Sequence, residues 1–189
     1  MKKIAILALL ATAAIASPAM AQTSTTGTIN ITGTVAAKCF VLPGSGNTFG
    51  TTVAMGELSQ ADGTLKTSAT LSSTFGTVGG TGLTAQVVCT SANPDVSVLS
   101  EPLVNTALAA TGYDNSVDYT ADVTFTRVGG TTLVSDPSAV PAATTATLAS
   151  RLTGTGTNVS VATSGWTASG VLVAGSYAGK ITIVIAPGV

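Results

Sequence analysis

The sequence predicts an all-β fold, because short apolar–polar alternation recurs along the chain and helical periodicity is almost absent beyond its first residues. Gly, Pro, Asn and Asp interrupt the alternating segments at short intervals, which is typical of a sandwich or barrel of short strands. Charged residues make up only 8% of the chain, against about 25% in ordinary soluble domains. A surface of hydroxyls and small side chains can pack against copies of itself with little desolvation, although many secreted β-proteins share this composition.

Residues 1–21 have the features of a signal peptide. A basic start, Met1-Lys2-Lys3, precedes an apolar run over residues 4–15, and Ala19-Met20-Ala21 supplies the small-x-small pattern of a cleavage site. The run is shorter than the roughly 20 residues that a membrane span needs; a buried or uncleaved helix is the alternative. We expect cleavage after Ala21 and export of residues 22–189.

The composition excludes several classes of function. Two of the seven basic residues belong to the leader, so residues 22–189 carry five basic residues against eight carboxylates and a net charge of −3. This balance lacks the basic footprint of a nucleic-acid-binding protein, and we expect no nucleic-acid partner. The chain contains no histidine, so neither a Ser-His-Asp nor a Cys-His arrangement can form. We expect no catalytic residues, no metal site and no cofactor.

The two cysteines, Cys39 and Cys89, both lie in the part that is expected to be exported. An oxidising compartment favours pairing them, and only one intramolecular pairing is possible. The closed loop of about 50 residues corresponds to roughly 4 kcal/mol in the chain-entropy estimate. We therefore predict a disulfide between them.

Eight segments have the period-two pattern or the turn boundaries of strands. Residues 115–128 predict the longest strand, and Gly129-Gly130 predicts a hairpin turn after it. Residues 49–57 are expected to form a short strand or an irregular edge, residues 65–75 a weak alternating stretch, and residues 135–150 a loop or irregular edge, with a short helix over 142–151 as a further alternative. The predicted strands cover residues 28–35, 83–90, 96–98, 115–128, 131–134, 159–162, 169–173 and 180–186. With no internal repeat and no linker, we expect one domain.

The first predicted strand, residues 28–35, is apolar on one face only. Ile29, Ile31 and Val35 lie on that face together with Gly33, and no charged residue occurs between Gln22 and Ala37. Such a strand is an adhesive edge that monomeric proteins usually protect with charge or proline. It can pack into its own domain or add to another chain, and burial of its three large side chains corresponds to roughly 5–9 kcal/mol at most. The pattern alone leaves both alternatives open.

Several segments, in this order and spacing, resemble a known family. They are Gly27-Thr28-Ile29-Asn30-Ile31 before Cys39, Phe49-Gly50, the run Ala85-Gln86-Val87-Val88-Cys89, Tyr113 and Tyr119, and Ala174-Gly175-Ser176-Tyr177 before the last strand. The chain resembles the spore coat protein U domain, the subunit family of archaic chaperone–usher pili. The resemblance covers nearly all of the mature protein and depends on order and spacing more than on any single motif.

The resemblance implies an incomplete immunoglobulin-like β-sandwich that is completed by donor-strand exchange. A periplasmic chaperone would fill the gap first, and an outer-membrane usher would replace it with the N-terminal strand of the next subunit, a copy of this chain or a related one. The implied product is a pilus at the cell surface that supports adhesion or biofilm formation. The implied domains are a donor extension at 22–36 and a pilin-like domain at 37–189.

The family's functional positions carry over onto residues of this chain. Ile29, Ile31, Gly33 and Val35 would be donor-strand residues. Ile181, Ile183 and Ile185 would lie on the last strand beside the acceptor groove, and Cys39 and Cys89 would hold the first two strands together. Tyr177 is expected to support the core.

A secreted β-sandwich binding module that does not polymerise is the alternative function. Trp166, the only tryptophan, is expected in a Gly/Ser/Thr loop, where it could stack on a sugar, although a core or edge position is favoured. Asp114, Asp118 and Asp122 recur every four residues, which could indicate a calcium site. In a strand this spacing separates the carboxylates widely, so a solvated face is the favoured interpretation.

Overall fold

The computed structural model describes residues 26–44, 46–77 and 83–188. The chain divides into two units, Met1–Thr34 and Val35–Val189. In the first unit, the described residues 26–34 form neither helix nor strand, whereas the sequence predicted a strand there. The predicted signal peptide and the glycines Gly79, Gly80 and Gly82 lie outside the described residues.

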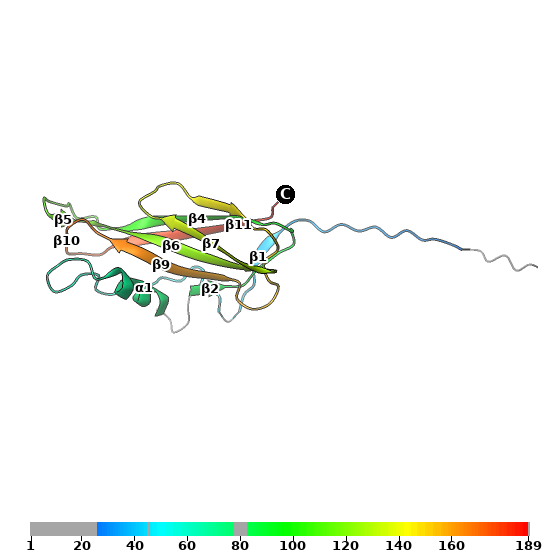
Figure 1. The fold of residues 1–189 in the computed structure, drawn as a ribbon, viewed down its shortest axis with the longest axis horizontal. Helices are drawn as coiled ribbons and strands as arrows, with labels where there is room; N and C mark the ends of the chain where they lie inside the picture. Colours follow the sequence, from blue (N-terminus) through cyan, green and yellow to red (C-terminus); the bar gives the residue numbers. More distant parts are fainter. Residues whose placement is uncertain (1–25, 45, 78–82, 189) are drawn as a thin grey trace, which may run out of the picture. The chain divides into compact units, whose positions relative to one another are not determined.

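The second unit confirms the predicted all-β, sandwich-like fold, with 43% of the described residues in strands and 6% in helix. In one half, β6 lies between β7 and β9, and β2 pairs with the other edge of β9. In the other half, β4 lies between β8 and β11. The bounds are β2 Leu83–Ala85, β4 Asp95–Val104, β6 Ser116–Arg127, β7 Gly130–Pro137, β8 Thr144–Thr147, β9 Val159–Thr167 and β11 Ala178–Ala186. All these pairings are antiparallel, and a short β4–β6 pairing joins the halves (Figure 1).

The core lies between the halves and follows the alternation in the sequence. The predicted longest strand is β6, and its alternate residues are all buried. They pack with Val96 and Val98 of β4 and with Val134 of β7 in one cluster. These buried residues of β6 are Val117, Tyr119, Ala121, Val123 and Phe125. The predicted hairpin is also present, since Arg127 of β6 pairs with Gly130 of β7.

The predicted strand over residues 83–90 is divided at Gln86 into β2 and β3 (Val87–Cys89). Its alternate residues are buried on one face, as predicted, but β2 pairs with β9 whereas β3 pairs with β1 (Cys39–Val41). Cys39 lies opposite Cys89 in the β1–β3 pair, and the two form the predicted disulfide with an S–S distance of 2.12 Å.

Two local predictions are wrong. Most of the stretch over residues 65–75 belongs to helix α1 (Ser68–Thr77), because Leu71 and Phe75, four residues apart, bury one helical face. The hydroxyl of Thr67 accepts a hydrogen bond from the Thr70 amide, which is typical of a helix N-cap.

Residues 135–150 are the second correction. They contain no helix and are only partly the predicted loop or irregular edge, because β7 extends to Pro137 and residues 144–147 form β8, which pairs with β4. The Ala/Thr-rich composition concealed β8, whose exposed face carries small polar residues.

The long strands place different segments at the two ends of this unit (Figure 1). Ala186 at the end of β11 pairs with Asp95, and β3 and β1 lie close by; we call this the β1 end, with residues 36–41 and the β6–β7 turn. Ala178 pairs with Val104 at the opposite end, which holds residues 57–64 and the parallel pair of β5 (Tyr113–Asp114) and β10 (Val171–Leu172). We call it the β5 end.

A buried carboxylate closes the side of the sandwich where β7 meets β8. Asp136 of β7 is fully buried, and its oxygens accept hydrogen bonds from the amides of Ser100 at 2.6 Å and Thr144 at 2.8 Å. The hydroxyls of both residues lie at 2.7 Å from the same carboxylate. Asp136 therefore connects β7 to both β4 and β8.

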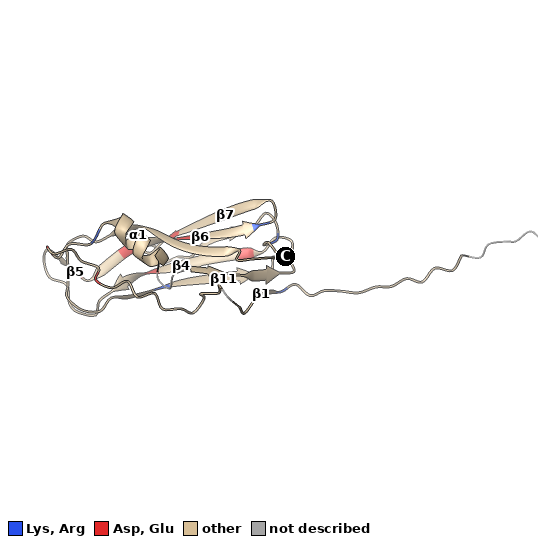
Figure 2. Ribbon diagram, turned by 90° about the horizontal axis from the view of Figure 1, so that it is seen from below, with Lys and Arg blue, Asp and Glu red and all other residues tan. Residues whose placement is uncertain are grey.

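Charged residues are sparse along the ribbon of the second unit (Figure 2). Among the described residues, the longest helix is α1, and none is long and apolar enough to cross a membrane.

Candidate functional site

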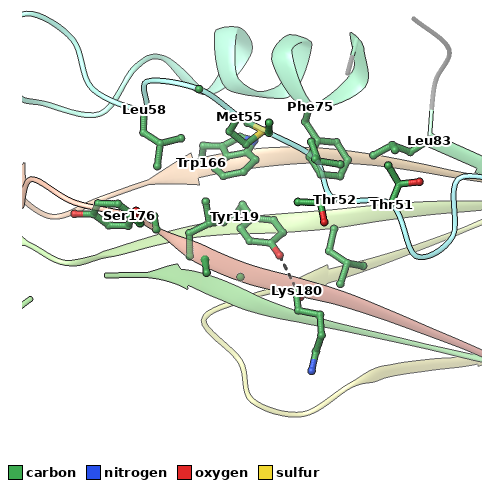
Figure 3. Close-up of a pocket in the computed structure, with 18 of the residues that line it drawn as sticks. Thr51, Thr52, Met55, Leu58, Phe75, Leu83, Tyr119, Trp166, Ser176 and Lys180 are labelled. Carbon is green, nitrogen blue, oxygen red and sulfur yellow. Dashed lines mark hydrogen bonds between the residues drawn. The ribbon is translucent and has the colours of Figure 1, made fainter. Parts of the chain in front are cut away.

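A large cavity opens on the side of the sandwich opposite Asp136, between β11 and residues 48–59. Its volume is about 1120 Å³. We call it the β11 cavity. Its floor consists mainly of large apolar side chains from β2, β6, β9 and α1, namely Leu83, Tyr119, Val161, Trp166 and Phe75 (Figure 3).

One wall of the β11 cavity is β11 itself. Along one edge it pairs with β4 from Ala178 to Ala186, with one irregularity near Lys180, but within the described part of the chain no strand pairs with its other edge. Ile181, Ile183 and Ile185 are half-buried against the core. The backbone edge of β11 is thus free beside a row of apolar side chains, where a further strand could continue the sheet.

The facing wall is the segment over residues 51–57, which has no helix or strand assignment. Val53 and Met55 are half-buried against the core, while Ala54 between them and the flanking Thr52 and Gly56 are exposed. No described residue forms a hydrogen bond with the backbone amides or carbonyls of residues 52–56. Both walls therefore present backbone groups without a partner among the described residues to a strand that enters the cavity.

Two stacked aromatic rings form the centre of the floor. Tyr119 and Trp166 lie with ring centroids 4.8 Å apart and an interplanar angle of 23°. The Tyr119 hydroxyl is 3.0 Å from the carbonyl of Glu101 and 3.3 Å from that of Lys180, so it bonds to the β4–β11 pair across the sandwich (Figure 3). Burial, with the nearby Glu101 and Asp136 carboxylates, raises the pKa of Tyr119 far above its usual range, so the group is neutral at physiological pH.

The remaining polar atoms of this floor are also used within the unit. The indole nitrogen of Trp166 donates to the Thr163 hydroxyl at 3.2 Å, and its backbone amide donates to the Ser68 hydroxyl of α1 at 3.0 Å. At the rim, Lys180 forms an ion pair with Glu101 at 3.0 Å. The cavity therefore offers apolar area and backbone hydrogen bonds, which suit a peptide strand better than a reacting small molecule.

The predicted donor residues lie outside any strand of this chain. Ile29, Ile31 and Val35 are 88%, 91% and 81% exposed. Together with Gly33 they occupy a segment without assigned structure over residues 26–38. Their apolar face is therefore not buried in this single copy.

The other predicted positions fall in three places. Ile181, Ile183 and Ile185 lie on β11, whose bounds, Ala178–Ala186, exceed the predicted 180–186 by two residues. The Tyr177 hydroxyl lies 2.9 Å from the Val173 carbonyl and 3.0 Å from that of Asp114, so it holds the chain before β11 against β5. Trp166 lies on β9 and is buried, not in a loop, because β9 extends to Thr167.

The three aspartates that recur every four residues have separate surroundings. Asp114 on β5 accepts hydrogen bonds from the amide and hydroxyl of Ser169, and Asp122 accepts from the hydroxyls of Ser135 and Ser164. Burial acts to raise the pKa of Asp114, but the bonds from Ser169 outweigh it and hold that pKa below its usual value. Within the described ranges, no cluster of three His, Cys, Asp or Glu residues is arranged to hold a metal ion.

Sequence reasoning missed two parts of the cavity. The sequence predicted a short strand or an irregular edge over residues 49–57. No strand forms there, and the position of residues 51–57 opposite β11 has no signal in local composition. Phe75 reaches the floor from α1, and its spacing of four from Leu71 was the signal that a helical interpretation would have used.

A scan of protein-family models and a search of curated proteins found no match to this chain. The resemblance to the spore coat protein U domain therefore stays a prediction.

Proposed function

We propose that this chain is a structural subunit of a surface fibre, and that the β11 cavity receives residues 28–35 of another copy or a related subunit. The observation that carries this proposal is the facing of two unpaired backbones, β11 and residues 52–56, across an apolar cavity. A single inserted strand can satisfy both. In this role the chain is an incomplete immunoglobulin-like sandwich.

The N-terminal segment has the composition that this cavity requires. Ile29, Ile31 and Val35 alternate with polar residues, so an extended strand turns all three toward the floor while Thr32 and its polar neighbours face out. Gly33 falls on the inward face, where it suits a close approach of the two backbones. No charged residue of the segment has to be desolvated.

The direction of insertion follows from the requirement for an open chain of subunits. The Ala36 carbonyl accepts a hydrogen bond from the Thr90 hydroxyl at 3.0 Å, so each copy's donor segment leaves from its β1 end. If the donor strand ran parallel to β11, the β1 ends of donor and acceptor would meet. The next copy would have to place its β1 end at the same position, where there is no room for it. Antiparallel insertion joins the β1 end of one copy to the β5 end of the next, and head-to-tail contacts of this kind form open filaments.

The proposed assembly route is export through the periplasm, protection of the open cavity by a chaperone, and release of that chaperone at an outer-membrane usher. The leader sequence, the disulfide and the low charge support an exported polymer. The signal peptide is expected to be removed after Ala21, and adhesion or biofilm formation is the proposed role of the fibre.

The test compares substitutions on the two faces of the donor segment. Ile31→Asp places a charge in the apolar cavity and is expected to abolish the ladder of oligomers on unheated SDS gels, whereas Thr32→Asp on the outward face should leave it intact. Deletion of residues 22–35 should act like Ile31→Asp. A wild-type chain that runs as a monomer without heating, or an Ile31→Asp chain that polymerises normally, would contradict the proposal.

Occupancy of the cavity can be followed separately. Trp166 is the only tryptophan and lies on the cavity floor. A peptide of residues 26–36 added to the Ile31→Asp chain should change its tryptophan fluorescence, and the same peptide with Asp at position 31 should not. An equal response to both peptides would show that the β11 cavity does not select the apolar face.

A further inference from the structure

The connection between a donor segment and its own sandwich is very short. Besides the bond to Ala36, the Thr90 hydroxyl accepts a hydrogen bond from the Lys38 amide at 2.9 Å, and the Thr90 amide donates to the Lys38 carbonyl at 2.9 Å. The chain is thus fixed from Ala36 onward, and consecutive Cα atoms are only about 3.8 Å apart. A Val35 seated in a neighbour's cavity therefore brings the donor's β1 end directly against that neighbour.

The surface that it meets is the β5 end of the acceptor, which carries a loop over residues 106–113, here called the β5-end loop. Internal hydrogen bonds hold this loop in shape. The Asn115 side-chain amide donates to the Ala107 carbonyl at 2.8 Å, the Tyr113 amide donates to the Ala110 carbonyl at 2.8 Å, and the Val171 amide donates to the Gly112 carbonyl at 3.0 Å. A loop ordered in this way loses little conformational entropy when it forms a contact.

The β5-end loop exposes two large apolar side chains. Leu108 is 92% exposed and Tyr113 is 55% exposed. At the opposite end of the sandwich, Phe40 and Val41 of β1 and Val128 of the β6–β7 turn are exposed as well. Exposed apolar residues can mark interaction surfaces, and these lie at the two ends that antiparallel insertion joins.

The charges at the two ends are of opposite sign. Lys38 and Arg151 flank Thr90 at the β1 end, and the Arg151 side chain reaches the Thr90 carbonyl at 3.4 Å. At the β5 end, Glu57 and Asp62 are exposed, and hydrogen bonds from Ser59 and Thr64, respectively, lower the pKa of each carboxyl. Each end also carries a residue of the opposite charge, Asp95 at the β1 end and Lys66 at the β5 end. Complementary charge of this kind favours one orientation of approach.

We propose that the β5-end loop of one copy packs against the β1 end of the next copy, with Leu108 and Tyr113 against its apolar residues and Glu57 and Asp62 near its Lys38 and Arg151. This contact rests on the proposed strand exchange, but it is a second interface, formed between folded domains. It fixes the angle between successive subunits, which the single backbone link between the inserted strand and its own domain would otherwise leave free to bend.

The test uses fibres of the full-length chain. Leu108→Asp is compared with Leu133→Asp, whose side chain is 60% exposed on β7, away from both ends. Both variants should give the SDS-resistant ladder, because neither residue lines the β11 cavity. The persistence length of Leu108→Asp fibres, measured by electron microscopy, should fall to about half of the wild-type value or less, since domains joined without an interface move relative to one another by default.

Zero-length carbodiimide cross-linking gives a second measurement on the wild-type fibre. Lys38 and the carboxylates of Glu57 and Asp62 lie at opposite ends of one copy, so a cross-link between them must join two copies. The ion pair of Lys180 with Glu101, at 3.0 Å within one copy, is the positive control for the reaction. We expect a cross-link from Lys38 to Glu57 or Asp62.

The outcomes separate this proposal from strand exchange itself. A ladder with unchanged persistence length in Leu108→Asp, or the control cross-link without any from Lys38 to the β5 end, overturns the end-to-end contact and leaves strand exchange intact. A wild-type chain without a ladder overturns strand exchange, and the end-to-end contact with it.

Discussion

The two long sides of the sandwich differ in whether their polar groups find hydrogen-bond partners among the described residues. Where β7 meets β8, Asp136 is fully buried and bonds to residues of β4 and β8. Where β11 faces residues 52–56, both backbones lack partners among the described residues and a cavity of about 1120 Å³ separates them. The same fold thus completes one side with its own polar groups and leaves the other side without a strand.

This difference supports the proposal that the open side receives a strand. A fold that can bury a carboxylate with all its hydrogen bonds satisfied on one side could pair its last strand on the other. Instead, β11 carries the row Ile181, Ile183 and Ile185 against the core, and one of its edges has no strand partner among the described residues. Its missing neighbour is what the proposed donor segment supplies.

Removal of the Asp136 carboxylate from the closed side should have the largest effect on stability. Asp136→Ala leaves the buried amide of Ser100 and the partly buried amide of Thr144 without acceptors, and we expect a loss of about 3–5 kcal/mol in the free energy of unfolding. Urea denaturation in the Ile31→Asp background, which is expected to stay monomeric, measures it. Thr131→Ala, on the exposed face of β7, is the matched control and should change stability little. An effect of Asp136→Ala no larger than this control would show that the closed side does not depend on the carboxylate.

Removal of the disulfide on the open side should lower the free energy of unfolding by less than Asp136→Ala does. The disulfide joins β1 to β3 at the start of the chain segment that becomes the facing wall, and the pair is only three residues long. Replacing Cys39 and Cys89 together with Ala should lower the free energy of unfolding by about 2–4 kcal/mol. It should also weaken binding of the donor peptide, followed by Trp166 fluorescence. Unchanged peptide binding in the double variant would show that the wall holds its place without the disulfide.

The two sides should also differ in their response to acid. Burial acts to raise the pKa of Asp136, but the hydrogen bonds from Ser100 and Thr144 outweigh it and hold that pKa below its usual value. Its contribution to stability is therefore complete above the unfolded-state pKa of about 3.9 and is lost as the pH falls through the lower folded-state pKa. Urea midpoints of the parent and of Asp136→Asn should converge below about pH 4. A difference that stays constant down to pH 2 would contradict this role.

The smallest effect is expected at the rim of the cavity. The ion pair of Lys180 with Glu101 is largely exposed, with side-chain exposures of 62% and 47%. Lys180→Met should change the free energy of unfolding by less than about 1 kcal/mol, because exposed pairs are screened by solvent. Donor-peptide affinity should also be nearly unchanged. A large loss of peptide binding would assign this lysine a direct contact with the donor.

Much of the fold was predictable because strand alternation is a local signal. The buried face of β6, the shared face of β2 and β3, and the isoleucine row of β11 all follow from residues two positions apart. The disulfide followed from having only two cysteines. The helix α1 was missed because its two buried residues are four positions apart in a Thr/Ser-rich stretch that carries few other signals.

The sequence by itself determined the strand faces, the disulfide and the unusual N-terminal segment, since each depends on residue type and on spacing along the chain. Only the tertiary structure decided that β11 keeps one edge unpaired, that residues 51–57 face it, and that Asp136 is buried on the opposite side. The physical reason is that an edge is defined by the strands that lie beside it. Those neighbours are brought there from distant parts of the chain by the packing of the whole core.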